Sequence, residues 1–171
     1  ATGLFYHDTA TDPEKFMGLA PRFDSTSADN GQQIVLGDGS GSDNTSIWMV
    51  VWGERTCHLL YPQGTTAGFA RDDKGKQTKE SSNSVYDVYR EKFTWDVGLS
   101  VRDWRYVSRV ANIDVSNLTV NAASGTNLIE KMIKAYYKLH QRKVTGGKAV
   151  VYCNTTIKEY LHHQAMRGAT G

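Results

Sequence analysis

Hydrophobic and polar residues alternate along residues 93–101 of the chain. The hydrophobic positions are Phe93, Trp95, Val97, Leu99 and Val101. Because successive side chains of a β-strand point to opposite faces, this alternation predicts a strand with one buried face. Each side chain of this size stabilises a fold by roughly 1.5–3 kcal/mol when it is fully buried. We therefore expect this stretch to be the central strand of a sheet.

A second hydrophobic stretch, residues 47–52, shows no alternation. A short continuous run rich in β-forming residues predicts a strand that is covered on both faces. Glu54 and Arg55 fit a turn, and residues 56–61 fit a returning strand. We expect these two strands to form a hairpin.

Helical spacing appears in the last third of the chain. Hydrophobic residues recur there every three or four positions at Leu128, Ile129, Met132, Ile133, Tyr136 and Tyr137. Asn127 and Glu130 form a capping box at the start of this helix. A short buried strand follows at residues 148–153, and a second helix is expected from Thr156 to about Met166. Near the start of the chain, Asp12 and the proline after it predict a further short helix.

Two polar stretches, residues 24–46 and 71–84, are expected to be loops because turn-forming or charged residues dominate them, and within the first only residues 34–36 could form a strand. The second loop is expected to be an exposed contact element, and residues 85–109 are expected to supply one long strand or two consecutive strands. A chain of 171 residues is long enough for one domain. We predict an α+β fold with a mixed, mainly antiparallel sheet and two amphipathic helices in the C-terminal third. Residues 1–120 form the β-rich part and residues 121–171 a helix–strand–helix layer.

The composition is typical of a globular protein, with 39% hydrophobic and 22% charged residues. The 20 basic and 18 acidic side chains give a net charge of +2. This balance gives no argument for a nucleic-acid or membrane partner. The longest hydrophobic run, residues 47–52, is far shorter than the roughly 20 residues of a membrane-spanning helix. The two cysteines, Cys57 and Cys153, are expected to be buried and reduced.

No catalytic, metal or cofactor site is apparent in the sequence. Cys57 and His58 are neighbours in a predicted strand, so their side chains point apart and cannot act as a nucleophile and its base. His162 and His163 lack a third ligand at a metal-binding spacing. The glycines at residues 37–41 precede a strand and not a helix, which argues against a phosphate-binding loop.

The cluster Arg102, Asp103, Trp104 and Arg105 is the strongest candidate for a binding surface. Arginine and aromatic side chains alternating with one another could stack on single-stranded nucleic acid. The balanced charge of the chain favours a packed protein interface instead, where Arg, Trp and Tyr are the preferred anchors. We therefore predict that these four residues lie at a subunit interface.

Three segments together resemble the major capsid proteins of tailed bacteriophages. They are PEKFMGLAPRF at residues 13–23, GSDNTSIW at 41–48 and GLSVRDWRYV at 98–107. The resemblance extends over essentially the whole chain. It implies the Hong Kong phage type of capsid fold, represented here by the axial domain and part of the peripheral domain. It also implies a fragment that lacks the N-terminal arm, the extended hairpin loop, most of the spine helix and the C-terminal strands.

The resemblance implies a structural virion protein without enzymatic activity, a subunit of an icosahedral head that encloses the genome. Its partners would be copies of itself in capsomer rings, scaffolding or other head proteins, and packaged DNA in non-specific contact. It would be assembled in the cytoplasm of a bacterial host and located in the virion, with no membrane contact.

Two other functions remain open on the residues alone. One is a β-rich ligand-binding module, such as a carbohydrate binder, that uses Trp48, Trp95 or Trp104 as an exposed platform. The other is a hydrolase in which Cys57, a histidine and a carboxylate meet only in the folded protein. Exposed coplanar aromatic rings would favour the first function, and a thiol next to an exposed imidazole would favour the second.

Overall fold

The computed structural model describes residues 2–64, 68–81, 84–141 and 143–168. The chain divides into two compact units, one formed by Ala1–His58 with Leu99–Gly171 and the other by Leu59–Gly98. The helices are α1 (Thr2–Tyr6), η1 (Gly31–Gln33), η2 (Trp104–Tyr106), α2 (Leu128–Lys138) and α3 (Thr155–Gly168). The strands are β1 (Ile34–Leu36), β2 (Asn44–Trp52), β3 (Cys57–Leu60), β4 (Ala70–Ser81), β5 (Ser84–Thr94), β6 (Gly98–Val101), β7 (Val107–Asp114) and β8 (Lys148–Tyr152).

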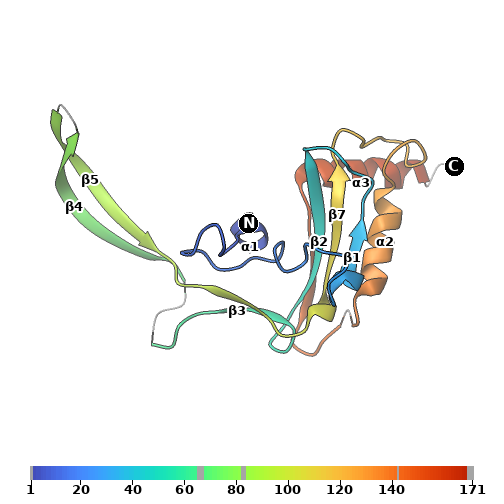
Figure 1. The fold of residues 1–171 in the computed structure, drawn as a ribbon, viewed down its shortest axis with the longest axis horizontal. Coiled ribbons are helices and arrows are strands. Elements are labelled where there is room, and N and C mark those ends of the chain that lie inside the picture. Colours follow the sequence, from blue (N-terminus) through green and yellow to red (C-terminus); the bar gives the residue numbers. More distant parts are fainter. Residues whose placement is uncertain (1, 65–67, 82–83, 142, 169–171) are drawn as a thin grey trace. The chain divides into compact units, whose positions relative to one another are not determined.

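A mixed sheet with β2 near its centre is the main feature of the first unit (Figure 1). Its strand order is β1-β7-β2-β3-β6, and β8 pairs with β2 as well. The long contacts of β2 with β7 and with β8 are antiparallel, whereas β1 runs parallel to β7. The predicted fold class is therefore confirmed: α+β with a mixed, mainly antiparallel sheet and two helices in the C-terminal third.

Strand β2 supplies hydrophobic side chains to a core on each face of the sheet. Ile47, Met49 and Val51 belong to the core beneath α2 and α3. Trp48 and Val50 point the other way, into a core completed by side chains near the start of the chain, namely Phe5, Leu19 and Phe23. The continuous hydrophobic run at residues 47–52 is thus a strand covered on both faces, as predicted.

The helices begin where the sequence predicts. The Asn127 side chain accepts a hydrogen bond from the backbone N–H of Glu130 at 3.0 Å, which caps α2. In α3, Ile157 is fully buried against the same core as Leu128 of α2. Figure 1 shows α2 along the side of the sheet and α3 behind it. Hydrophobic side chains spaced three and four residues apart explain this packing.

The expectation that residues 93–101 form the central strand is wrong. Phe93 lies near the end of β5, the side chain of Trp95 is 60% exposed, and the strand stops before β6 begins at Gly98. Of the five alternating hydrophobic side chains, Leu99 alone is buried. Alternation identifies a strand from its local periodicity, but it carries no information about what covers the hydrophobic face.

Four further expectations are corrected. No helix starts at Asp12, and the short helix near the start of the chain is α1, Thr2–Tyr6. Strand β3 pairs parallel to β2 through Trp52 and Cys57, so residues 47–61 form no antiparallel hairpin. Residues 71–81 of the expected loop at 71–84 belong to β4. Residue 84 opens β5, and residues 82–83 lie outside the described part of the chain. Cys153 is exposed, because it follows β8 at the surface.

Candidate assembly surfaces

Within the part of the chain that the structure describes, no three His, Cys, Asp or Glu side chains come together as a metal-binding group. Cys57 is the buried thiol of the pair, with no exposed surface. Burial raises the pKa of this thiol to about 12, so it remains protonated at neutral pH. A dry, protonated thiol is a poor nucleophile, which removes the basis for a Cys57 hydrolase.

The three tryptophans that could have formed a ligand platform have different environments. Trp48 is only 2% exposed and stacks on Phe5 with ring centroids 5.6 Å apart. The Arg109 guanidinium covers the Trp48 ring at 4.9 Å. Trp104 is half-buried against the core around Trp48, and Trp95 is exposed. Because Trp48 faces the interior, a platform that includes it is not formed.

The candidate interface residues Arg102–Arg105 form a turn that includes the first two residues of η2, with Asp103 as its N-cap. Asp103 accepts a hydrogen bond from the backbone N–H of Arg105 at 3.0 Å. The Arg105 guanidinium donates to both oxygens of the same carboxylate, at 3.0 Å from Nε and 2.7 Å from Nη2. These hydrogen bonds hold the pKa of Asp103 below its usual range.

Neighbouring elements fix the position of this turn. The backbone N–H of Arg102 donates to the carbonyl of Thr56 at 2.8 Å, and the backbone N–H of His140 donates to the carbonyl of Arg105 at 3.1 Å. The side chains of Arg102 and Arg105 are exposed at the surface. The turn therefore presents two arginines from a backbone that is held in place, although Asp103 is already satisfied within its own turn.

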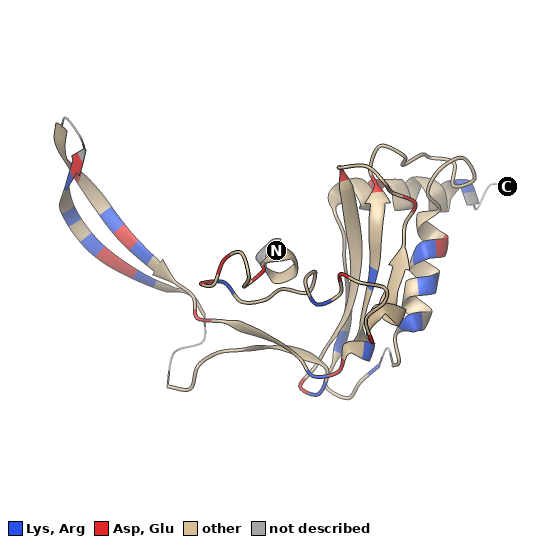
Figure 2. Ribbon diagram, viewed as in Figure 1, with Lys and Arg blue, Asp and Glu red and all other residues tan. Residues whose placement is uncertain are grey.

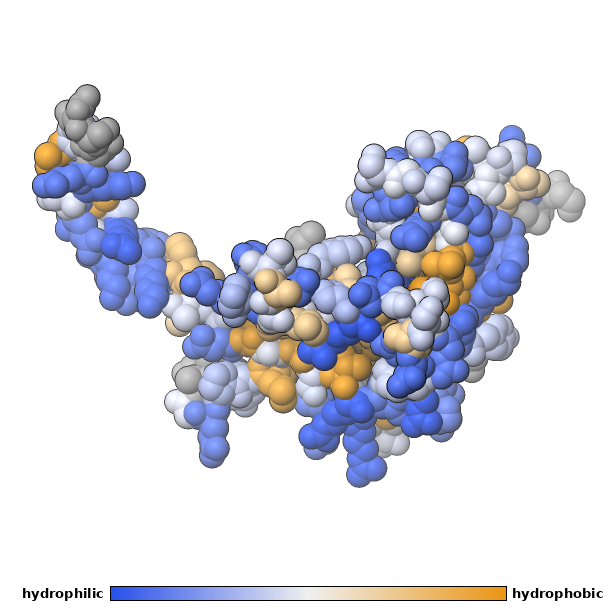
Figure 3. All heavy atoms as spheres, in the orientation of Figure 1, coloured by the Kyte–Doolittle hydropathy of each residue, from blue (hydrophilic) through white to orange (hydrophobic). Residues whose placement is uncertain are grey.

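The second unit contains a long antiparallel hairpin of β4 and β5, whose first strand and pairing the sequence analysis did not predict. Acidic and basic residues follow one another along both strands (Figure 2). Hydrophobic residues appear at its surface between the hydrophilic ones (Figure 3). Phe69 and Phe93 stack at the base of the hairpin with centroids 5.2 Å apart, and both remain more than half exposed.

The second strand of this hairpin, β5, falls within the stretch at residues 85–109 that the sequence predicts to be strand. Residues 85–93 read VYDVYREKF, in which aromatic and β-branched residues are frequent. Such residues favour strands. The charges of residues 71–80 concealed the partner strand, because charged side chains are common both in loops and on exposed strands.

Comparison with protein families finds a match that covers nearly the whole chain. The family described as Major capsid protein GP7 matches residues 1–170. The chain belongs to this family. No curated protein matches the sequence.

Membership of this family makes the chain a structural protein of the phage capsid, found in the virion. The resemblance to major capsid proteins drawn from residues 13–23, 41–48 and 98–107 is thereby confirmed. Among the described residues, no helix is both long and hydrophobic enough to cross a membrane. The resemblance also implied that an extended hairpin is missing, yet β4 and β5 form a long one in this capsid protein.

Proposed function

We propose that this capsid protein functions by packing against copies of itself in a closed icosahedral shell that encloses the phage genome. The observation that carries the proposal is the exposed hydrophobic surface of the second unit. Its exposed hydrophobic side chains are Leu59, Leu60, Tyr61, Phe69, Val85, Tyr86, Tyr89, Phe93 and Trp95. Exposed hydrophobic surface on this scale is typical of a protein interface.

The low stability expected of a lone hairpin supports the same proposal. A two-stranded hairpin is only marginally stable in water, because it has no layer against which to bury a hydrophobic face. The β4–β5 hairpin has paired strands of 12 and 11 residues, and most of its described side chains are exposed. A neighbouring subunit would supply the missing layer, and many such weak contacts sum to a stable shell. The hairpin would then serve as the extended loop of the capsid fold.

The turn at Arg102–Arg105 is proposed as a second contact. Because the backbone of the turn is already fixed, it needs no further ordering on binding, and arginine is frequent among residues that dominate interface energy. Scaffolding or other head proteins and packaged DNA belong to the same proposal as further partners, with assembly in the bacterial cytoplasm. A net charge of +2 is compatible with non-specific contact with DNA.

The proposal is tested by expressing the intact gene and imaging the purified protein by electron microscopy. Uniform closed shells are expected from the wild-type protein. The double substitution Tyr89→Ser with Phe93→Ser removes two exposed aromatic rings from the hairpin and is expected to abolish the shells. A matched control, Val120→Ser, removes an exposed hydrophobic side chain elsewhere and should leave the shells intact.

Two results would overturn the proposal. One is a wild-type protein that remains monomeric and forms no particles at any concentration. The other is a double variant that forms shells with the same yield as the wild type. Circular dichroism of the double variant separates loss of assembly from loss of folding, since the core around β2 contains neither substituted residue.

A further inference from the structure

The two faces of the β4–β5 hairpin carry opposite charge. Paired residues of an antiparallel ladder project to the same face, and the faces alternate along each strand. One face, here called the Tyr89 face, contains Arg71, Asp73, Lys76, Thr78, Glu80, Val85, Asp87, Tyr89, Glu91 and Phe93. The other, called the Tyr86 face, contains Asp72, Gln77, Lys79, Tyr86, Val88, Arg90 and Lys92. Four carboxylates against two cations make the Tyr89 face acidic, and three cations against one carboxylate make the Tyr86 face basic.

The charges of the Tyr89 face are partly paired with one another. Arg71 forms an ion pair with Glu91, and Lys76 lies 2.8 Å from Asp87. After this pairing, two carboxylates, those of Asp73 and Glu80, give the face its negative charge.

The cations of the Tyr86 face lack carboxylate partners. The one acidic residue of this face, Asp72, pairs with Lys74. In the described part of the chain, neither Lys79 nor Lys92 has an ion-pair partner, and Arg90 donates to the neutral amide of Gln77 at 3.4 Å. Three cations therefore remain available to an acidic surface.

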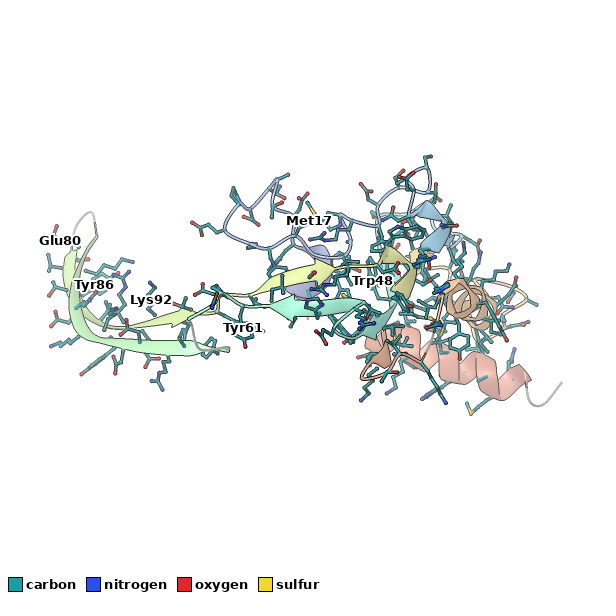
Figure 4. The ribbon with its side chains drawn as sticks, turned by 90° about the horizontal axis from the view of Figure 1, so that it is seen from below. Met17, Trp48, Tyr61, Glu80, Tyr86 and Lys92 are labelled. Carbon is teal, nitrogen blue, oxygen red and sulfur yellow. The ribbon has the colours of Figure 1, made fainter. Side chains whose placement is uncertain are left out.

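The two faces also differ in shape. A bulge between Asp73 and Lys76, with Gly75 at a φ of 65°, bends the hairpin. Figure 4 shows Tyr86 and Lys92 on the inner side of the bend and Glu80 on the outer side. A hollow of about 570 Å³ opens on the hairpin and is lined by residues of both faces, with Gln77, Lys79, Tyr86, Val88 and Arg90 from the Tyr86 face and Thr78 and Tyr89 from the Tyr89 face.

We propose that hairpins of neighbouring copies nest, with the Tyr89 face of one copy against the Tyr86 face of the next. The inference rests on the proposed self-assembly and names the surfaces that meet. Charge and shape both support it, because an acidic outer face meets a basic inner face. Tyr89, which is 84% exposed, lies on the outer face and would pack against the inner face of the neighbour.

This contact has a defined symmetry. Because the two faces differ, each copy contacts one neighbour through its Tyr89 face and the other neighbour through its Tyr86 face. Such a heterologous contact closes into a ring when the rotation between copies permits it. Two hairpins packed face to face, about 10 Å apart, supply each other with the layer that a lone hairpin lacks.

Charge reversal tests the nesting. A basic-face variant carries Lys79→Glu, Arg90→Glu and Lys92→Glu, which makes both of its faces acidic. An acidic-face variant carries Glu80→Lys and Glu91→Lys, which makes both faces basic. In sedimentation velocity at low salt, each variant alone is expected to self-associate at least about tenfold more weakly than the wild type, because like charges then oppose each other. An equimolar mixture should recover association, since every contact in an alternating assembly again joins opposite charges.

The outcomes separate the two proposals. Variants that each associate as strongly as the wild type would overturn nesting and leave self-assembly standing. A mixture that associates no better than its components would also overturn nesting. This criterion applies as well if the substitutions unfold the hairpin. A wild-type protein that does not associate at all would overturn the proposed function together with the nesting.

Discussion

At the scale of single residues, the polar groups that the fold buries are as informative as the hydrophobic ones. Gln164 of α3 is 3% exposed and contacts the segment that leads into α2. Its amide nitrogen donates to the carbonyls of Thr119 and Thr126 at 3.1 and 3.0 Å, and its oxygen accepts from the N–H of Leu128 at 3.0 Å. One side chain thus satisfies three backbone groups and fixes the start of α2 to α3.

Gln164→Leu should therefore destabilise the protein although leucine is hydrophobic and of similar size. Each buried backbone group left without a partner costs about 1–3 kcal/mol, so we expect a loss of about 3 kcal/mol or more in the free energy of unfolding. Urea denaturation followed by circular dichroism measures it. His162→Leu, at an exposed position of the same helix, is the control and should change stability by less than about 0.5 kcal/mol. Equal stabilities of the two variants would contradict the role given to Gln164.

At the scale of elements, the turn before η2 shows how local electrostatics fixes a short segment. Asp103 accepts from both the backbone and the guanidinium of Arg105, and these local bonds add to the backbone hydrogen bonds that tie the turn to Thr56 and His140. Because the pKa of Asp103 is held below its ordinary value of 3.8, the stabilisation is complete above that pH. It is lost as the pH falls through the lower pKa of the folded state, where the carboxylate gains a proton.

Asp103→Asn is accordingly expected to lower the melting temperature at pH 7, with a difference from the wild type that shrinks toward zero in strong acid. Thermal unfolding from pH 7 to pH 2 measures this difference. If most of the effect passes through the Arg105 side chain, the same substitution made together with Arg105→Ala should show a much smaller pH-dependent difference from Arg105→Ala alone, because only the hydrogen bond from the backbone N–H remains. A difference that persists unchanged at pH 2 would show that the carboxylate charge is not the cause.

At the scale of the whole molecule, the two units differ in how they are stabilised. The first unit has a hydrophobic core on each face of β2, whereas the β4–β5 hairpin depends on cross-strand pairs at an exposed surface. The first unit should therefore be locally more stable than the hairpin, because a segment with few buried contacts opens easily.

Hydrogen exchange measures local stability directly. In the unassembled protein, backbone amides of β2 and β7 should exchange far more slowly than those of β4 and β5. In assembled particles, the hairpin amides should gain protection while those of β2 change little, because only the hairpin gains a new layer. Hairpin amides that exchange equally fast in both states would show that the hairpin is not an assembly contact.

The hydrophobic core beneath α2 and α3 could be predicted from local patterns. The run at residues 47–52 predicted β2 because an unbroken hydrophobic strand has to be covered on both sides. The cap at Asn127 and the buried position of Ile157 followed from side-chain chemistry and helical periodicity. The candidate turn at Arg102–Arg105 was found from its composition, and its role at an interface stays a prediction.

The sequence by itself determined the class of the fold, the main buried strand and the two C-terminal helices, because these depend on periodicities that residues a few positions apart create. Only the tertiary structure decided that β2 and not residues 93–101 lies at the centre of the sheet. It also paired residues 70–81 with 84–94 and revealed the two charged faces that this pairing creates. Burial and strand pairing join residues that are distant in the chain, and no local pattern records which residues those are.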